Sequence, residues 1–264
     1  MSGPAPVARA FKVGATGLGI YAATLLVGAL LEQNATGAAV AQAVLAEWGC
    51  GRLGITWSDP LAPAPSGKDI ARRAGKGALL GLGAAAAAAL VLLVTRSARV
   101  AEIGVSLTTL LLGLLLGGFA AMRDELLLHG LVLHVTSGVR SPYPRIAAAA
   151  LASGAALVSA PMVTPAEILG ATLFGGAFAA MWLLDRGAWL AWGAHAALLF
   201  GTRALFRGGL FELRSLHVSG AGLAAPFGGW AMAAVGGLVL VGSLVMIHRA
   251  GLWRGGTGAP ACFP

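Results

Sequence analysis

The chain has 264 residues, of which 58% are hydrophobic and only 11% are charged, and its net charge is +8. Soluble domains contain about 25% charged residues, so this composition excludes a water-soluble globular protein and indicates a polytopic membrane protein. The positive charge is then expected at the membrane surface. No basic stripe is interleaved with aromatic residues, and we therefore expect no nucleic-acid partner.

The fold class predicted from the apolar segments is an all-α transmembrane bundle of about eight helices, because a crossing needs about 20 apolar residues. The expected helices are 13–31, 36–50, 77–95, 103–122, 145–161, 167–184, 189–203 and 227–248. The first follows Arg9 and Lys12 and has no small-residue cleavage site, which favours a retained helix over a cleaved signal peptide. The second is the shortest, so its crossing is the least certain of the eight.

The longest polar stretch, residues 51–76, is expected to be a loop or an interfacial segment. We expect a single domain in two parts. Residues 1–76 form an N-terminal part that ends with this polar stretch, and residues 77–264 form a transmembrane core. With eight crossings, most Lys and Arg fall on the side of the N-terminus, which predicts that both termini face the cytoplasm. Abundant Gly, Ala and Arg are typical of a GC-rich bacterial genome, so we expect a multi-pass protein of the bacterial inner membrane.

A charged cluster, MRDELLLHG at 122–130, interrupts the fourth apolar segment. An acid at membrane depth costs about 2.5–3.5 kcal/mol on insertion scales. Glu125 and His129 are four residues apart and share a helix face, whereas Asp124 and Glu125 point in different directions. Because apolar sequence continues on both sides, we expect one helix through 123–136 with its acids in a wet pocket. The alternative is a helix end at the cytoplasmic surface with solvated acids.

A second polar position lies in the seventh apolar segment. His195 stands eight residues beyond the turn Asp185-Arg186-Gly187, within an otherwise apolar helix. A lone histidine in such a helix is usually structural. The buried acidic cluster elsewhere in the chain favours a shared site instead, with His195 facing the carboxylates.

Together the two segments resemble the type II CAAX-prenyl proteases and bacteriocin-processing (Abi-type) proteins, a family of glutamate-dependent intramembrane endopeptidases. DELLLHG matches the family's first motif, Glu-Glu-x-x-x-Arg, with Asp124 and Glu125 at the two glutamates and His129 at the arginine. His195 matches the histidine of the third motif, His-x-x-x-Asn, and Leu199 stands at its asparagine. The resemblance covers about residues 104–204.

The second family motif, Phe-x-x-x-His, has no matching histidine. Leu157 stands in the place of its phenylalanine and Pro161 in the place of its histidine. Donors for the developing oxyanion must then come from elsewhere, and Ser159, Thr164 and His129 are candidates for a supporting role.

The resemblance implies hydrolysis of a peptide bond in a membrane-tethered protein or peptide, without a cofactor. It implies that Asp124 is the base, that Glu125 is the second acid, and that His195 orients the water or holds the oxyanion. The missing second-motif histidine and third-motif asparagine favour an alternative, a catalytically impaired relative that binds membrane peptides or acts as a scaffold. A transporter that uses the acids as an ion site is a further alternative, but no internal repeat supports it.

Two other chemistries are disfavoured by spacing. No His-Glu-x-x-His motif occurs, so we expect no metal. No Gly-x-Ser-x-Gly elbow surrounds Ser106, Ser153 or Ser159, so no serine nucleophile is expected.

Two predictions concern structure alone. Glu167 follows Thr164-Pro165 and is expected in the first turn of a helix, where an acid is favourable. Trp182, Trp189 and Trp192 lie near a helix turn and are expected at the membrane interface.

Overall fold

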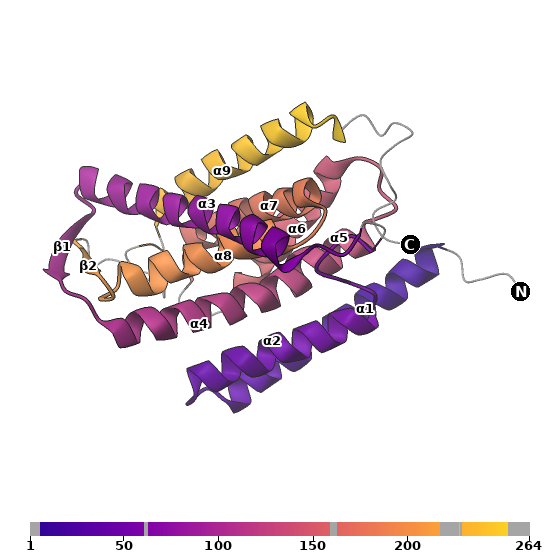
Figure 1. Ribbon diagram of the computed structural model, residues 1–264, viewed down its shortest axis with the longest axis horizontal. Helices are drawn as coiled ribbons and strands as arrows, with labels where there is room; N and C mark the ends of the chain where they lie inside the picture. Colours follow the sequence, from indigo (N-terminus) through magenta and orange to yellow (C-terminus); the bar gives the residue numbers. More distant parts are fainter. Residues whose placement is uncertain (1–5, 61–62, 159–162, 217–226, 228, 253–264) are drawn as a thin grey trace, which may run out of the picture.

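The computed structural model describes residues 6–60, 63–158, 163–216, 227 and 229–252. The helices are α1 (Pro6–Leu30), α2 (Ala35–Arg52), α3 (Gly67–Val94), α4 (Leu107–Asp124), α5 (Leu131–Val135), α6 (Pro142–Val158), α7 (Pro165–Asp185), α8 (Trp189–Phe200) and α9 (Trp230–Arg249). Two π-helical segments extend α4 and α8, namely η1 (Glu125–Gly130) and η2 (Gly201–Leu205). The mostly helical bundle confirms the predicted fold class (Figure 1).

Each of the expected segments contains a helix, including the short 36–50, which forms most of α2. The helix also continues through the charged cluster. Both residues that flank η1, Asp124 and Leu131, keep right-handed helical backbone angles, so α4, η1 and α5 form one unbroken helical segment. The interpretation as a helix end at the surface is therefore wrong.

Two predicted boundaries differ from the structure. The polar stretch 51–76 ends early, because Ser66 caps α3 by accepting a hydrogen bond from the backbone N–H of Asp69 at 3.2 Å. Helix α3 consequently crosses the division drawn after residue 76. The fourth helix begins at Leu107 rather than at 103, because residues before it form a strand.

That strand, β1 (Ala98–Ile103), pairs antiparallel with β2 (Phe211–Ser215). The register runs from Ala98 opposite Ser215 to Ile103 opposite Phe211, with an irregularity between Val100 and Glu102. This small sheet ties the end of α3 to the segment after η2 at one end of the bundle (Figure 1).

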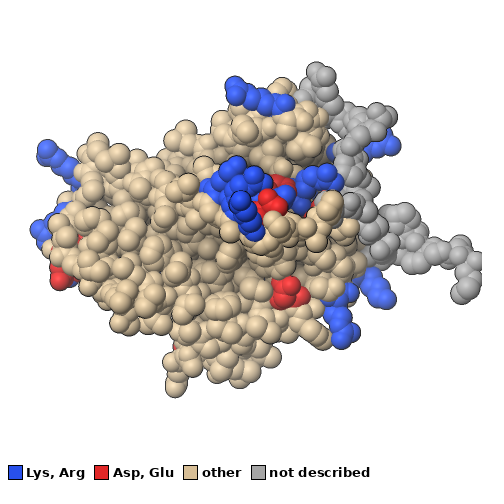
Figure 2. Space-filling model, in the orientation of Figure 1, with Lys and Arg blue, Asp and Glu red and all other residues tan. Residues whose placement is uncertain are grey.

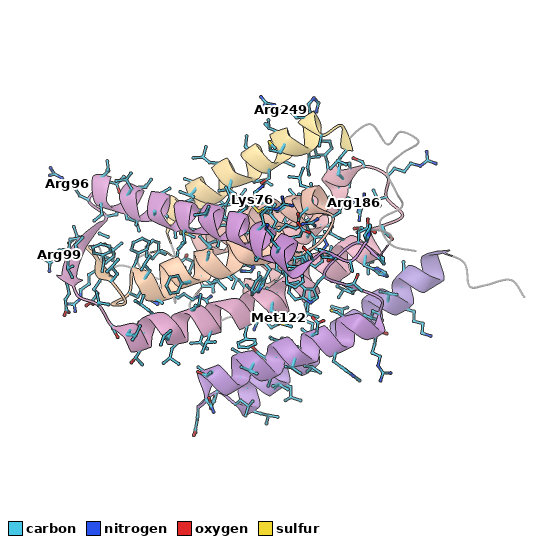
Figure 3. The ribbon with its side chains drawn as sticks, in the orientation of Figure 1. Lys76, Arg96, Arg99, Met122, Arg186 and Arg249 are labelled. Atoms are coloured by element: carbon cyan, nitrogen blue, oxygen red, sulfur yellow. The ribbon has the colours of Figure 1, made fainter. Side chains whose placement is uncertain are left out.

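The length of the helices and their apolar composition together define a multi-pass membrane protein. Among the described residues, four helices are long and apolar enough to cross a bilayer, in α1, α3, α7 and α9. Apolar and uncharged residues cover most of the visible face (Figure 2). Arg96 and Arg99 lie at the end that carries β1, whereas Lys76 and Arg186 lie toward the other end (Figure 3). Helix α1 begins and α9 ends at that second end (Figure 1).

Small residues allow α3 and α8 to pack backbone against backbone. A Cβ atom at Gly77 would overlap the carbonyl oxygen of Leu190, and one at Gly81 would overlap that of Ala194. Gly193 meets the backbone of Ala74 in the same way from the other side. This close approach is typical of membrane helices with a Gly-x-x-x-Gly spacing, and it positions the helix that carries His195.

The prediction for Glu167 is confirmed, and that for Trp182 is wrong. Glu167 and Thr164 form a reciprocal capping box at the start of α7, with Thr164 N donating to the Glu167 carboxylate at 2.7 Å. Trp182 is 2% exposed and lies in the core, since Gly130 of the neighbouring helix leaves room for its ring. Trp189 remains partly exposed and stacks on Trp57, with ring centroids 4.9 Å apart.

Candidate functional site

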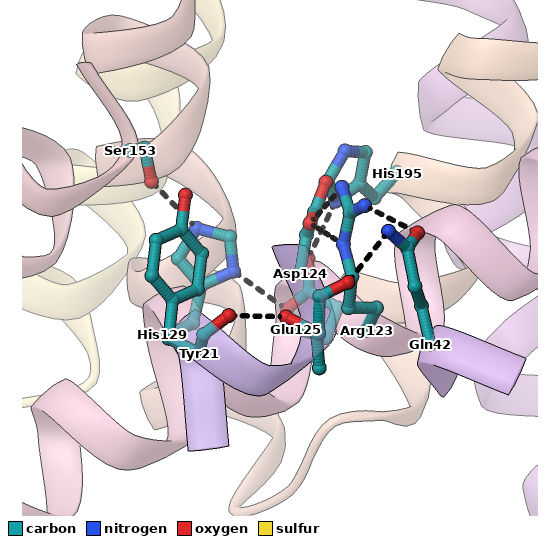
Figure 4. A network of polar contacts seen from close by, with 9 residues as sticks. Tyr21, Gln42, Arg123, Asp124, Glu125, His129, Ser153 and His195 are labelled. Atoms are coloured by element: carbon teal, nitrogen blue, oxygen red, sulfur yellow. Dashed lines mark hydrogen bonds and ion pairs between the residues drawn. The ribbon is translucent and has the colours of Figure 1, made fainter. Parts of the chain in front are cut away.

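Glu125 is completely buried and lies between two histidines (Figure 4). Its Oε1 is 3.0 Å from Nδ1 of His195, and its Oε2 is 3.0 Å from Nδ1 of His129. The contact with His195 has hydrogen-bond geometry, whereas the contact with His129 is bent away from a linear hydrogen bond. An ionised carboxylate only accepts hydrogen bonds, so in that state Nδ1 of His195 is the donor in this contact. The predicted meeting of the acidic cluster with His195 is thus present in the structure.

The two histidines come from different elements. His129 lies one turn after Glu125 in η1, and π-helical insertions of this kind occur frequently at functional sites. His195 lies in the middle of α8, where its ring stacks on Phe178 of α7 with centroids 4.5 Å apart and planes at 14°. Packing between these helices therefore restricts the orientation of the His195 ring.

His129 has a third partner on α6. Its Nε2 lies 3.1 Å from Oγ of Ser153, and that hydroxyl also lies 3.0 Å from the carbonyl oxygen of Ala149. A hydroxyl has one hydrogen, so when Ser153 donates to Ala149, Nε2 of His129 donates to Ser153. Ser153 thereby links His129 to α6 and restricts the orientation of its ring.

If the carboxylate–imidazole cluster is catalytic, replacing Ser153 with Ala is expected to lower its activity about tenfold, because losing one hydrogen bond of about 1–1.5 kcal/mol frees the ring of His129. The matched control is Ser243→Ala. Ser243 is equally buried and donates to the carbonyl of Val239 at 2.9 Å, but it lies outside the site. The rates of that activity in the two variants, at equal expression, measure the effect. Equal rates for the two would contradict a role for Ser153 beyond packing.

Asp124 lies in a different environment from Glu125. Its Oδ1 is 2.7 Å from Nε and 2.6 Å from a terminal nitrogen of Arg123, and its side chain is 19% exposed. Arg123 also donates to Gln42 at 2.9 Å, and Gln42 donates to the carbonyl of Thr24 at 2.9 Å (Figure 4). The two adjacent acids thus diverge: one is ion-paired at the edge of the site, and the other is enclosed by imidazoles.

A cavity of about 610 Å³ adjoins the cluster. Asp124, His129, Ser153, His195 and Leu199 all contribute to its wall. His195 is the better placed of the two histidines to meet a molecule in this cavity, because its side chain is 13% exposed and that of His129 only 1%. No described residue hydrogen-bonds to Nε2 of His195, so this nitrogen is available to a ligand or a water.

The residues that the sequence predicts for a supporting role lie in different parts of the structure. His129 contacts Glu125 as its sequence spacing indicates, and Leu199 presents an apolar side chain to the cavity. Leu157 also lines the cavity. Ser159 and Pro161 lie outside the described residues.

Sequence reasoning missed Ser153 as a partner of His129 and Arg123 as a partner of Asp124. One signal for Ser153 was available, namely a polar residue next to Gly154 in an Ala-rich helix. The Ser153 side chain fits against α7 because residue 175 there is a glycine. A Cβ atom at Gly175 would overlap the Ser153 hydroxyl. In the part of the chain that the structure describes, no group of three His, Cys, Asp or Glu residues has an arrangement that could hold a metal ion.

These features define a multi-pass membrane protein with a buried carboxylate–imidazole cluster beside a cavity. The chain matches no protein-family model and no curated protein.

Proposed function

We propose that the protein is an intramembrane endopeptidase of the kind that its two motifs resemble, and that it hydrolyses a peptide bond in a membrane-tethered protein. The observation that carries the proposal is the contact between Glu125 Oε1 and His195 Nδ1 at 3.0 Å, with His195 in the cavity wall. A carboxylate that accepts from Nδ1 fixes the tautomer in which Nε2 is a base.

In the proposed mechanism, Nε2 of His195 takes a proton from a water in the cavity as that water attacks the peptide carbonyl. Glu125 stabilises the resulting imidazolium, and the proton then passes to the leaving amine. Asp124 as the base stays a prediction. Its Oδ1 is occupied by Arg123, and its Oδ2, which has no partner among the described residues, belongs to a side chain in the wall of the same cavity as His195.

The test compares protein termini in membranes of cells that express wild type, His195→Ala or Asp124→Asn, by quantitative mass spectrometry. New termini that depend on the wild-type protein are expected to disappear with His195→Ala, because loss of a general base costs about 10²–10⁴-fold. A comparable loss with Asp124→Asn would assign the base to Asp124. Normal processing by both variants would refute the peptidase.

A second candidate function is favoured by Leu199. The related proteases carry an asparagine at this place, whereas here an apolar side chain faces the cavity. An apolar wall at this place agrees with a binding or scaffold protein whose site is inactive. It predicts that His195→Ala retains the same co-purifying membrane partners and the same cellular effect as wild type, with no processed termini in either.

The proposed location is the bacterial inner membrane with both termini in the cytoplasm. Helix α1 begins and α9 ends at the same end of the bundle, the end toward which Lys76 and Arg186 lie (Figures 1 and 3). Basic residues collect on the cytoplasmic side of membrane proteins. A C-terminal green fluorescent protein fusion is therefore expected to fluoresce, and a C-terminal alkaline phosphatase fusion to be inactive. The reverse pattern would contradict the orientation.

A further inference from the structure

Arginines outnumber acids in the wall of the cavity beside the carboxylate–imidazole cluster. Three arginines line it, namely Arg123, Arg203 and Arg207, together with two acids, Asp124 and Glu167. The acids are occupied: Asp124 pairs with Arg123 at 2.6 Å, and Glu167 accepts from the backbone of Thr164 at 2.7 Å.

Arg203 differs from the other two arginines. Its charged neighbours are Asp124, Arg123 and Arg207, and it makes no hydrogen bond or ion pair with any residue in the described part of the chain. Arg203 is exposed in η2, so its guanidinium is open to water or to an anion from outside the chain. Since the nearby carboxylate is already neutralised by Arg123, an anion from outside the chain is the fitting partner.

The face of α8 and η2 that lines the cavity carries an arginine at one end, a leucine in the middle and a histidine at the other end. His195, Leu199 and Arg203 follow one another at intervals of four residues and therefore lie on one side of the helix. At 1.5 Å per residue, His195 and Arg203 are separated by about 12 Å along the axis. A ligand along this face meets a cation at one end, and beyond it an apolar wall that leads to the imidazole.

The remaining wall is apolar. Leu25, Leu128, Leu157, Phe174, Phe178 and Met232 contribute side chains from several helices. An anionic group joined to a hydrocarbon chain satisfies both parts of the cavity at once, and a phosphate matches the fork of an arginine side chain in a bidentate contact. Basic pockets between membrane helices are typical sites for lipid headgroups.

We propose that this cavity binds an anionic phospholipid, with its phosphate on Arg203 and one acyl chain along the apolar wall toward His195. The site is independent of peptide hydrolysis, since none of the contacts that carry it involves a proton transfer. A bound lipid would place its chain beside the carboxylate–imidazole cluster.

The experiment measures thermal stabilisation of the full-length protein in dodecyl maltoside. Dihexanoyl-phosphatidylglycerol, dihexanoyl-phosphatidylcholine and inorganic phosphate are titrated separately. Wild type is expected to be stabilised by the anionic lipid at concentrations at least about tenfold lower than by the zwitterionic one. Equal stabilisation by both lipids, or by inorganic phosphate alone, would overturn the proposal. This comparison uses the wild-type protein and does not depend on the folding of any variant.

Arg203→Gln is expected to weaken the apparent affinity for phosphatidylglycerol at least about tenfold, because a charge-assisted bidentate contact is lost. The matched control is Arg99→Gln, which removes the same charge from exposed strand β1 at the same end of the bundle. The control is expected to bind within about twofold of wild type. Equal affinities for Arg203→Gln and wild type would refute the site. Lipid binding is measured without substrate, so it stays interpretable if no peptidase activity is found.

Discussion

Replacement of Glu125 with Gln is expected to reduce cleavage about 10⁴-fold while the protein still folds. A carboxamide has nearly the same volume as the carboxylate, but it has one acceptor and one donor. One of the two Nδ1 atoms at 3.0 Å then faces an N–H donor instead of an acceptor, so that ring must change tautomer or turn away. An imidazole in the wrong tautomer no longer accepts a proton from water at Nε2. Loss of wild-type-dependent protein termini in membranes measures the effect.

The matched control is Glu102→Gln, which makes the same chemical change in exposed strand β1. It is expected to process substrate as wild type does. Size-exclusion profiles of the two variants show whether either has misfolded. Undiminished processing by Glu125→Gln, in a protein that elutes normally, is incompatible with a catalytic cluster around this carboxylate.

Replacement of Gly81 with Leu is expected to prevent correct packing of α3 against α8. A Cβ atom there overlaps the carbonyl oxygen of Ala194, which is backbone and cannot rotate away. Overpacking a core typically costs about 1–3 kcal/mol, and separating two backbones also breaks contacts along the rest of the interface. The midpoint of thermal aggregation in detergent should fall by about 2–12 °C, since about 1 kcal/mol shifts the midpoint of a domain of this size by about 2–4 °C.

Gly83→Leu is the control for this change. Gly83 lies two residues away on the same helix, is exposed, and has no atom within 4 Å of a Cβ position. It is expected to leave the midpoint unchanged or to raise it slightly, since Gly is a poor helix former. If both variants melt together, the close approach of α3 and α8 contributes little to stability.

The membrane class and most helices could be predicted from the sequence, because they depend on composition and on local apolar length. Helix α2 was predicted correctly at 36–50 despite its shortness. The continuation through Asp124 and Glu125 was also predictable, since apolar residues follow the acids directly. The strand before Leu107 was not, because its partner β2 lies more than a hundred residues later in the chain and local sequence carries no trace of that pairing.

Within the site, residue spacing alone determined that Glu125 and His129 share one helix face, because a helix brings residues four apart together wherever it is formed. Which acid faces the imidazoles, and which pairs with Arg123, was decided only by the tertiary structure. The same holds for Ser153 beside His129 and for the guanidinium of Arg203 in the cavity wall, which has no ion pair within the described ranges. These contacts join residues on different elements, and α8 among them is placed by backbone-to-backbone packing against α3 at glycines. How closely two helices pack depends on the shapes of both, and the sequence of one segment does not show which other segment it will contact.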